Sequence, residues 1–397
     1  MLDTFGDTLA APATHAAEPS PAYEGWPEEG LKWVTVPRKS APGLNALLRW
    51  AFELGASRVA FSTGKPVMLR VHGRNRFVTR QALNEGEIAD VANHLYGSDG
   101  IARLQNGADF DVAYEIAVDR TTRLRFRLNA TPTRTSRHFG VNIVLRPIAD
   151  MPASLAEQHV GAGILEACRP QNGIVLVGGS VGSGKSTLIA GMTVAKLLDP
   201  SGHYNIVEGA APVEFLLEQI RSPCSSIDQT EIPRDLPTFE AFIRGCWRRE
   251  PTDIIVGECR DGPTMAASVN ASMAGSALFT TIHVNSVKLT VQRVVSLLPA
   301  DERANLVNAL AQSLRLVINQ RLVPSTDGKR TALREFLVFD AALRRQMLQA
   351  DPSDWPDLAH RALDGQGQSY PAAIRAALEQ GRITEQTAAA ELRREDS

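Results

Sequence analysis

Residues 179–186 read Gly-Ser-Val-Gly-Ser-Gly-Lys-Ser and fit the pattern G-x-x-x-x-G-K-[ST]. The apolar run at 174–177 precedes them and the segment 187–192, which can open a helix, follows. The predicted context is therefore strand, loop and helix. Glycines let such a loop curl until backbone N–H groups and the helix N-terminus face a polyphosphate. A flexible loop that binds nothing is the alternative, and the flanking strand and helix argue against it. The residues of the predicted phosphate-binding loop are Gly179, Ser180, Val181, Gly182, Ser183, Gly184, Lys185, Ser186 and Thr187.

Composition places the chain among ordinary globular proteins. Its 397 residues are 44% hydrophobic and 22% charged, and they are enough for two domains. Lys+Arg 42 against Asp+Glu 44 gives a net charge of -2, so we expect no direct nucleic-acid binding. The 4 cysteines show no C-x-x-C spacing, which predicts neither a metal site nor a disulfide.

No stretch approaches 18 apolar residues, so no transmembrane segment is expected. Asp3 and Asp7 stand where a signal peptide would need basic residues. We therefore expect a cytoplasmic protein.

The pattern of residues predicts five segments along the chain. Residues 1–40 are rich in proline and poor in periodic apolar positions, and we expect a mostly disordered leader. Residues 41–147 mix short helical and strand patterns, as a small α+β domain does, and a linker at 148–160 follows. Strands alternate with helices over 161–349, as an α/β sheet requires. A helical tail is expected over 350–397.

Two arginines of the N-terminal domain alternate with apolar residues. Arg125 and Arg127 lie between Leu124, Phe126 and Leu128 on a predicted strand. One face of this strand should be core and the other should carry guanidinium groups. Such a face is usually only solvated, but it could also reach the nucleotide of a neighbouring molecule.

Two residues follow apolar strands of the second domain. Glu258 follows Gly257 and the apolar run at 254–256, and an acid at this position could orient water for hydrolysis of a bound nucleotide. A surface glutamate just after a strand is the alternative. His283 ends the predicted strand at 278–283, and spacing alone does not decide between a structural and a catalytic role.

Several separate blocks resemble the type II/IV secretion ATPase (GspE/PilT-like) family over about residues 44–348. Residues 178–187 resemble the Walker A box of that family, and 248–261 resemble its atypical Walker B box, in which the acid follows a glycine. The further similar blocks are 274–286 for the His box, 212–215 for the end of the Asp box, 314–315 and 319–322 beyond the His box, and 55–57 and 125–129 in the N-terminal domain.

The resemblance implies an α/β protein with a PAS-like α+β N-terminal domain joined to a RecA-like P-loop ATPase domain. It also implies a homohexamer that binds ATP between the two domains, with Mg²⁺. Lys185 and Ser186 would bind phosphate and Mg²⁺, Glu258 would assist catalysis, and His283 would sense or relay the nucleotide state. The candidate arginine fingers are Arg125, then Arg127, Arg134 or Arg137.

The Asp box departs from the family pattern, because Ala210 occupies its first acidic position. Either Glu208 and Glu214 together do that work, or hydrolysis is slower than in relatives. We expect the first, which requires the backbone at Gly209 to bend.

The function expected from the resemblance is that of an ATP-hydrolysing motor of a type IV secretion or conjugative transfer system, of the DotB/TraJ type. It would act at the inner face of the cytoplasmic membrane with inner-membrane components of that machinery. The leader, the tail and the Ala-Pro of the Asp box favour this type. A PilT-like pilus retraction ATPase and an ATP-binding regulatory module with little turnover are the alternatives.

Overall fold

The computed structural model describes residues 41–71, 74–79, 82–119, 123–135, 139–148 and 151–395. The predicted leader at 1–40 and Arg137 lie outside the described residues. The chain divides into two compact units, one from residues up to 109 together with 130–144, the other from 110–129 together with 145–397. Within the described residues a six-stranded and an eight-stranded sheet organise the chain.

The N-terminal sheet has the strand order β3-β2-β1-β6-β5-β4. Leu124, Phe126 and Leu128 of β5 lie in the core, as their alternation predicts. Helix α3 begins at Glu85, because the side chains of Asn84 and Glu87 each accept a hydrogen bond from the other residue's backbone N–H. Helices and strands are mixed here as expected, and the PAS-like identity stays a prediction. The elements are α2 (Ala41–Glu53), β1 (Ala56–Ser62), β2 (Met68–Val71), β3 (Arg74–Phe77), α3 (Glu85–Tyr96), α4 (Gly100–Gln105), β4 (Phe110–Ala117), β5 (Arg123–Arg134) and β6 (Phe139–Ile148).

The C-terminal sheet has the strand order β14-β13-β12-β7-β11-β10-β8-β9. From β12 to β9 every printed pair of neighbours is parallel. β12 and β13 form an antiparallel hairpin, with Gly328 of its turn at φ 78°. The strands are β7 (Gly173–Gly178), β8 (Asn205–Ala210), β9 (Ser226–Glu231), β10 (Asp253–Val256), β11 (Ala277–Ile282), β12 (Leu314–Pro324), β13 (Arg330–Val338) and β14 (Gly367–Gln368).

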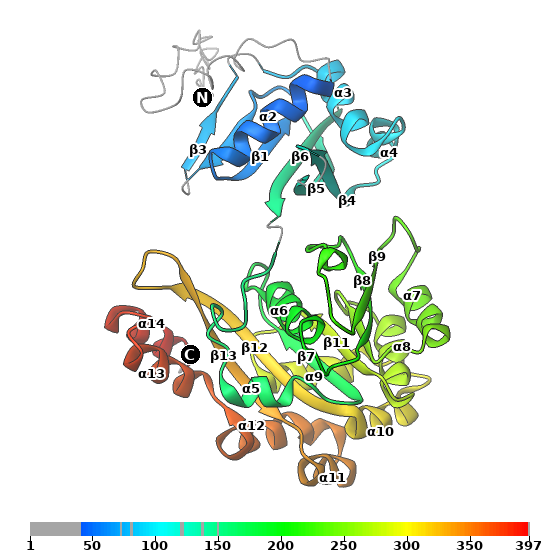
Figure 1. Ribbon diagram of the computed structural model, residues 1–397, viewed down its shortest axis with the longest axis vertical. Coiled ribbons are helices and arrows are strands. Elements are labelled where there is room, and N and C mark those ends of the chain that lie inside the picture. Colours follow the sequence, from blue (N-terminus) through cyan, green and yellow to red (C-terminus); the bar gives the residue numbers. More distant parts are fainter. Residues whose placement is uncertain are drawn as a thin grey trace, which may run out of the picture. The chain divides into compact units, whose positions relative to one another are not determined.

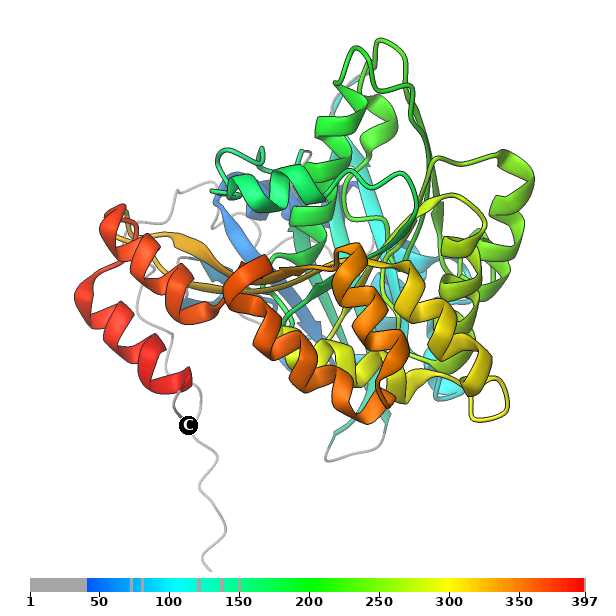
Figure 2. The same cartoon turned by 90° about the horizontal axis from the view of Figure 1, so that it is seen from below.

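Helices cover both faces of the C-terminal sheet (Figures 1 and 2). Val175 and Val177 of β7 pack with α5 and α6, whereas Ile174 and Leu176 face the opposite cluster with α7 to α12. This arrangement explains why β7 reads as a continuous apolar run. The helices are α5 (Ala162–Ala167), α6 (Lys185–Leu197), α7 (Phe239–Cys246), α8 (Gly262–Met273), α9 (Val287–Leu297), α10 (Arg303–Ser313), α11 (Ala341–Gln349) and α12 (Trp355–Gln366).

The two last helices lie beside the β12–β13 hairpin, where both views show them in red (Figures 1 and 2). α13 (Tyr370–Glu379) and α14 (Glu385–Glu395) share a small apolar cluster with Val323 and Leu333 of the hairpin. The helical tail predicted from residue 350 is therefore packed on the sheet. Among the described residues no helix is both long and apolar enough to span a membrane.

Candidate active site

The predicted phosphate-binding loop lies between β7 and α6. Gly179, Gly182 and Gly184 have φ of 147°, 78° and 84°, a region in which side chains are strained. A Cβ on Gly179 would stand 2.4 Å from the carbonyl oxygen of Gln320, so the loop is also tightly packed on β12. The glycines of the motif are therefore required by the conformation of the loop.

The open side of this loop fits a polyphosphate. Val181 is 81% exposed, and Ser180, Gly182 and Ser186 are exposed with it. Gly184 precedes α6 and offers no side-chain cap, so a ligand can reach the backbone N–H groups of the first turn. Ser186 is exposed in this first turn, and its predicted contact with Mg²⁺ stays a prediction.

Lys185 folds back over its own loop. Its Nζ donates to the carbonyl oxygens of Gly179 and Ser180 at 2.9 Å each, and lies 3.4 Å from Nδ1 of His283. Burial lowers the pKa of Lys185, because the charged amine has lost water. A phosphate in the loop would therefore give this ammonium a partner that the apo protein replaces with carbonyl groups.

Glu258 and His283 meet beside Lys185. They follow β10 and β11, which are parallel neighbours, and β11 in turn pairs with β7. Glu258 Oε2 lies 3.7 Å from Nε2 of His283, while its Oε1 accepts from Arg260. Burial lowers the pKa of His283, and the charge of Lys185 acts in the same direction while Glu258 opposes it. The structure thus brings Lys185, His283 and Glu258 into one row.

The Asp-box glutamates have different surroundings. Glu208 lies on β8, and its carboxylate accepts from Gln229 Nε2 at 2.5 Å. Burial raises the pKa of Glu208 to about 7, and the nearby charge of Glu214 adds to the rise. Glu214 lies in the loop after β8, near enough to Lys185 to favour the charged amine. Ala210 is buried at the end of β8.

The candidate arginine fingers lie on β5 and pair with carboxylates of β4. Arg125 Nε donates to Glu115 at 2.9 Å, and Arg127 makes a two-pronged contact with Asp111 at 3.1 and 2.7 Å. The hydrogen bond that Arg127 donates to Asp111 raises the pKa of Arg127. Arg134 is exposed at the end of β5. Their predicted role toward a neighbouring molecule's nucleotide stays a prediction.

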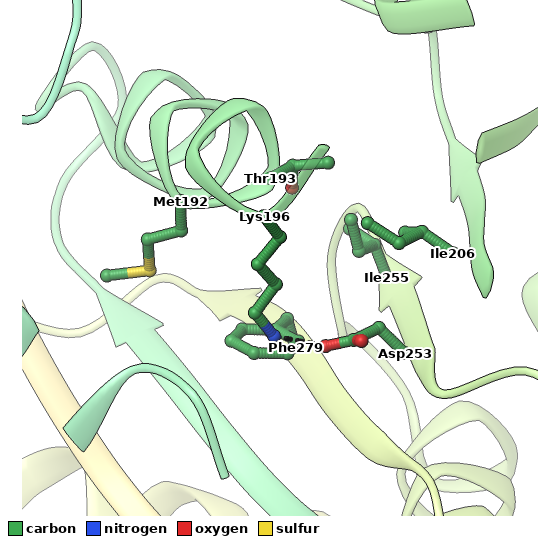
Figure 3. Close-up of a pocket in the computed structure, with 7 residues that line it drawn as sticks. All are labelled: Met192, Thr193, Lys196, Ile206, Asp253, Ile255 and Phe279. Atoms are coloured by element: carbon green, nitrogen blue, oxygen red, sulfur yellow. Dashed lines mark hydrogen bonds and ion pairs between the residues drawn. The ribbon is translucent and has the colours of Figure 1, made fainter. Parts of the chain in front are cut away.

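The far end of α6 is fixed to β10 by a buried ion pair (Figure 3). Lys196 and Asp253 are each 3% exposed in their side chains and contact one another directly. Nζ of Lys196 also lies 4.3 Å from the ring centre of Phe279, a cation–π contact. Because α6 starts at the loop and β10 leads to Glu258, this pair helps to set the relative position of the two.

Two glutamines, whose contacts the sequence does not predict, support the site. Gln229 of β9 holds both Glu208 and the main chain of Phe215 and Leu217 in the Asp-box loop. Gln320 of β12 donates to the carbonyl oxygen of Ser183 at 2.6 Å. These contacts join residues that are distant in the sequence. Gln320 lies in the block 319–322 that resembles the family, but that resemblance does not tell which residue it contacts, and Gln229 lies in none of the similar blocks.

A P-loop, an acid and a histidine at the ends of neighbouring parallel strands define a P-loop nucleotide-binding protein. The family model described as "Type II/IV secretion system protein" matches residues 44–367, so the chain belongs to this family. The resemblance seen in the sequence motifs is thereby confirmed.

Solved structures and curated relatives resemble the chain over most of its length. The Legionella pneumophila ATPase DotB is 33% identical with a TM-score of 0.82, covering 90% of this chain and 97% of that chain. The pilus retraction motor PilT with bound ADP is 25% identical with a TM-score of 0.73, covering 87% and 95%. The "type IV pilus retractation ATPase PilT" of Pseudomonas aeruginosa is 30% identical over 301 residues, 76% of this chain and 84% of that protein.

Proposed function

We propose that this ATPase is the ATP-hydrolysing motor of a type IV secretion or conjugative transfer system, like DotB. The row formed by Lys185, His283 and Glu258 at the open P-loop carries the proposal. Lys185 and Glu258 lie on the two sides of His283 in this row, and the proposal gives the first the role of binding phosphate and the second that of orienting water. The likeness to DotB over 97% of that chain supports the secretion role.

The residues act on ATP as follows. Nζ of Lys185 leaves the carbonyl groups of Gly179 and Ser180 for the β and γ phosphates, while the loop N–H groups hold the remaining oxygens. Glu258 orients the attacking water, and Arg260 holds the other oxygen of its carboxylate. Ser186 would hold Mg²⁺ together with the nucleotide, and that ion would supply positive charge to offset the charge that develops on the phosphates.

His283 reports whether the loop is filled. In the free protein its Nδ1 faces Lys185 Nζ at 3.4 Å, and it loses this neighbour when Lys185 turns to phosphate. The ring is then free to respond to Glu258 on its other side, 3.7 Å away.

Glu208 and Glu214 stand in for the acid missing at Ala210, with Gln229 orienting Glu208.

The working assembly is a homohexamer in which each copy, built from a PAS-like N-terminal domain and a RecA-like domain, binds ATP at its P-loop. Arg125 or Arg127 of one copy completes the site of the next as an arginine finger. Hydrolysis around the ring moves the domains as rigid bodies and so drives the membrane machinery. The ring docks on the cytoplasmic side of that machinery.

The test is ATP turnover of the full chain, measured as phosphate release, with nucleotide binding measured separately. Lys185→Ala should lose turnover and binding, while Glu258→Gln should lose turnover and keep binding. Lys288→Ala is the matched control, because that lysine pairs with Asp357 on a surface helix. Turnover by Lys185→Ala at the wild-type rate would exclude the proposed site.

A pilus retraction motor is the second candidate, favoured by the 30% identity with PilT over 84% of that protein. Deletion of the gene separates the two: loss of DNA or protein export supports the first, and loss of twitching motility supports the second.

An ATP-binding regulator is the third candidate, favoured by Ala210 in the Asp box. Phosphate release by the wild-type chain would exclude it.

A further inference from the structure

A buried side chain from the neighbouring strand holds the P-loop in place. Gln320 of β12 is 2% exposed, and its Nε2 donates to the carbonyl oxygen of Ser183 at 2.6 Å. A Cβ on Gly184 would stand 2.8 Å from this same Nε2, so the amide group packs directly beneath the loop. Gln320 therefore fixes the loop from its buried side.

The other end of the Gln320 amide is bound to a buried arginine. Arg334 of β13 is 4% exposed, and its Nε donates to Gln320 Oε1 at 2.7 Å. Arginine can only donate and the Ser183 carbonyl can only accept, so the amide has one possible orientation. The position requires a side chain that donates one hydrogen bond and accepts another. Among side chains as long as that of glutamine, only glutamine itself and a protonated glutamic acid do both.

Arg334 continues the chain of contacts to the segment before α5, residues 151–160, which we call the connecting segment. Its Nη1 donates to the carbonyl oxygens of Gln158 and His159 at 2.8 and 3.1 Å. The side chain of Gln158 in turn donates to the carbonyl oxygen of Thr187 in the first turn of α6, at 3.1 Å. The connecting segment is thus tied twice to the P-loop and its helix.

Burying the charged guanidinium of Arg334 costs stability, which indicates that its contacts serve a function other than packing. Among the ion pairs of the described residues none involves Arg334, so its charge is met only by neutral oxygens. Burial lowers the pKa of Arg334 to about 10, which still leaves it charged at neutral pH. An apolar residue would fill the same space without this penalty.

We propose that Gln320 and Arg334 are positioning residues that couple the P-loop to the connecting segment. Binding of a nucleotide in the P-loop then reduces the fluctuations of residues 151–160. The chain passes through this segment from the N-terminal sheet to the ATPase sheet. The inference rests on the proposed function, since a motor must carry the state of its nucleotide site to the part of the chain that moves.

The test uses the full chain with MgADP as the probe. Hydrogen exchange is followed in peptides covering 151–160, where the amides of Gln158 and Val160 are hydrogen-bonded within the segment. In the wild type, MgADP should slow this exchange.

Gln320→Glu keeps the contact with Arg334 but cannot donate to Ser183, and Arg334→Met breaks the contact with the segment. Both variants should lose the MgADP effect and raise KM for ATP about tenfold, with a smaller change in kcat.

Arg382→Met is the matched control. Arg382 also donates from its guanidinium to β13, at Thr331 and Ala332, but at the end near the C-terminal helices. Its loss should leave both KM and the MgADP effect unchanged at a comparable thermal stability. An equal rise of KM in all three variants would assign the effect to general destabilisation and overturn the coupling.

The two proposals fail in different ways. A wild-type chain that binds MgADP and releases phosphate, but whose segment 151–160 does not respond, overturns the coupling alone. So does an Arg334→Met variant with wild-type KM and a wild-type exchange response. A wild-type chain that neither binds MgADP nor releases phosphate overturns the proposed function and the coupling with it.

Discussion

At the scale of single residues, the carboxyl group of Glu208 is held by β8 in surroundings that disfavour its charge. Burial raises its pKa from 4.5 to about 7. The folded chain therefore binds more protons than the unfolded chain between these pH values, and stability falls as pH rises through this window. Glu208→Gln keeps an acceptor for Gln229 and removes the charge, so it should abolish this loss.

The stability gained by Glu208→Gln should be smaller than the full pKa shift would give, because the side chain of Glu208 is only partly buried. We expect Glu208→Gln to be about 2 kcal/mol more stable than the wild type at pH 8 and nearly equal to it at pH 5. Chemical denaturation at both pH values measures this difference. Glu166→Gln, on an exposed turn of α5, is the control and should show no such pH dependence. Equal stability of wild type and Glu208→Gln at pH 8 would contradict the burial argument.

At the scale of elements, the ion pair between α6 and β10 allows a sharp test of packing. Lys196→Met leaves Asp253 buried without its ammonium, which should cost about 3 to 5 kcal/mol of unfolding free energy. The double variant Lys196→Met/Asp253→Val removes both charges and should lose much less than the single one. Urea unfolding measures both values. A loss below about 1 kcal/mol for Lys196→Met would show that the pair is not desolvated as the structure has it.

The elements also show what the sequence could predict. β7 and β10 are buried on both faces and read as continuous apolar runs, so their type and place are predictable from the sequence. β9 reads Ser-Ile-Asp-Gln-Thr-Glu and has no such run, because it is the edge strand of the sheet. α8 is hard to predict for a related reason: Thr, Ala and Ser stand beside Met265 and Val269 on its buried face, which leaves little apolar periodicity.

The site divides in the same way. The glycines, Lys185 and Glu258 belong to short local motifs, so their places after β7 and β10 could be predicted from the sequence, while the role of Glu258 stays a prediction. The contact of Gln320 with Ser183 joins positions 137 residues apart, and that of Arg334 with Gln158 joins positions 176 apart. Such pairs depend on how β12 and β13 lie beside β7, which a single sequence does not reveal.

At the scale of the whole molecule, the proposed ring requires each copy to complete the site of its neighbour. Arg127 pairs with Asp111 but keeps 43% of its side chain exposed, so it is available to an approaching phosphate at the cost of one surface ion pair. Guanidinium groups suit this role because they stay charged and bind phosphate through two parallel hydrogen bonds.

A mixing experiment tests whether the site is shared between copies. Lys185→Ala lacks the phosphate-binding lysine but keeps the arginines, whereas Arg125→Ala and Arg127→Ala, tested separately, keep the P-loop. Each variant alone should be inactive if the altered arginine is the finger. In a ring assembled from equal amounts of Lys185→Ala and the finger variant, about one interface in four combines an intact P-loop with an intact arginine from the neighbour. Turnover should therefore return to about a quarter of the wild-type value after the chains are mixed and allowed to exchange. An arginine that acts within its own chain gives no recovery, because no chain in the mixture carries both groups, and this result would place the finger and the nucleotide in the same copy.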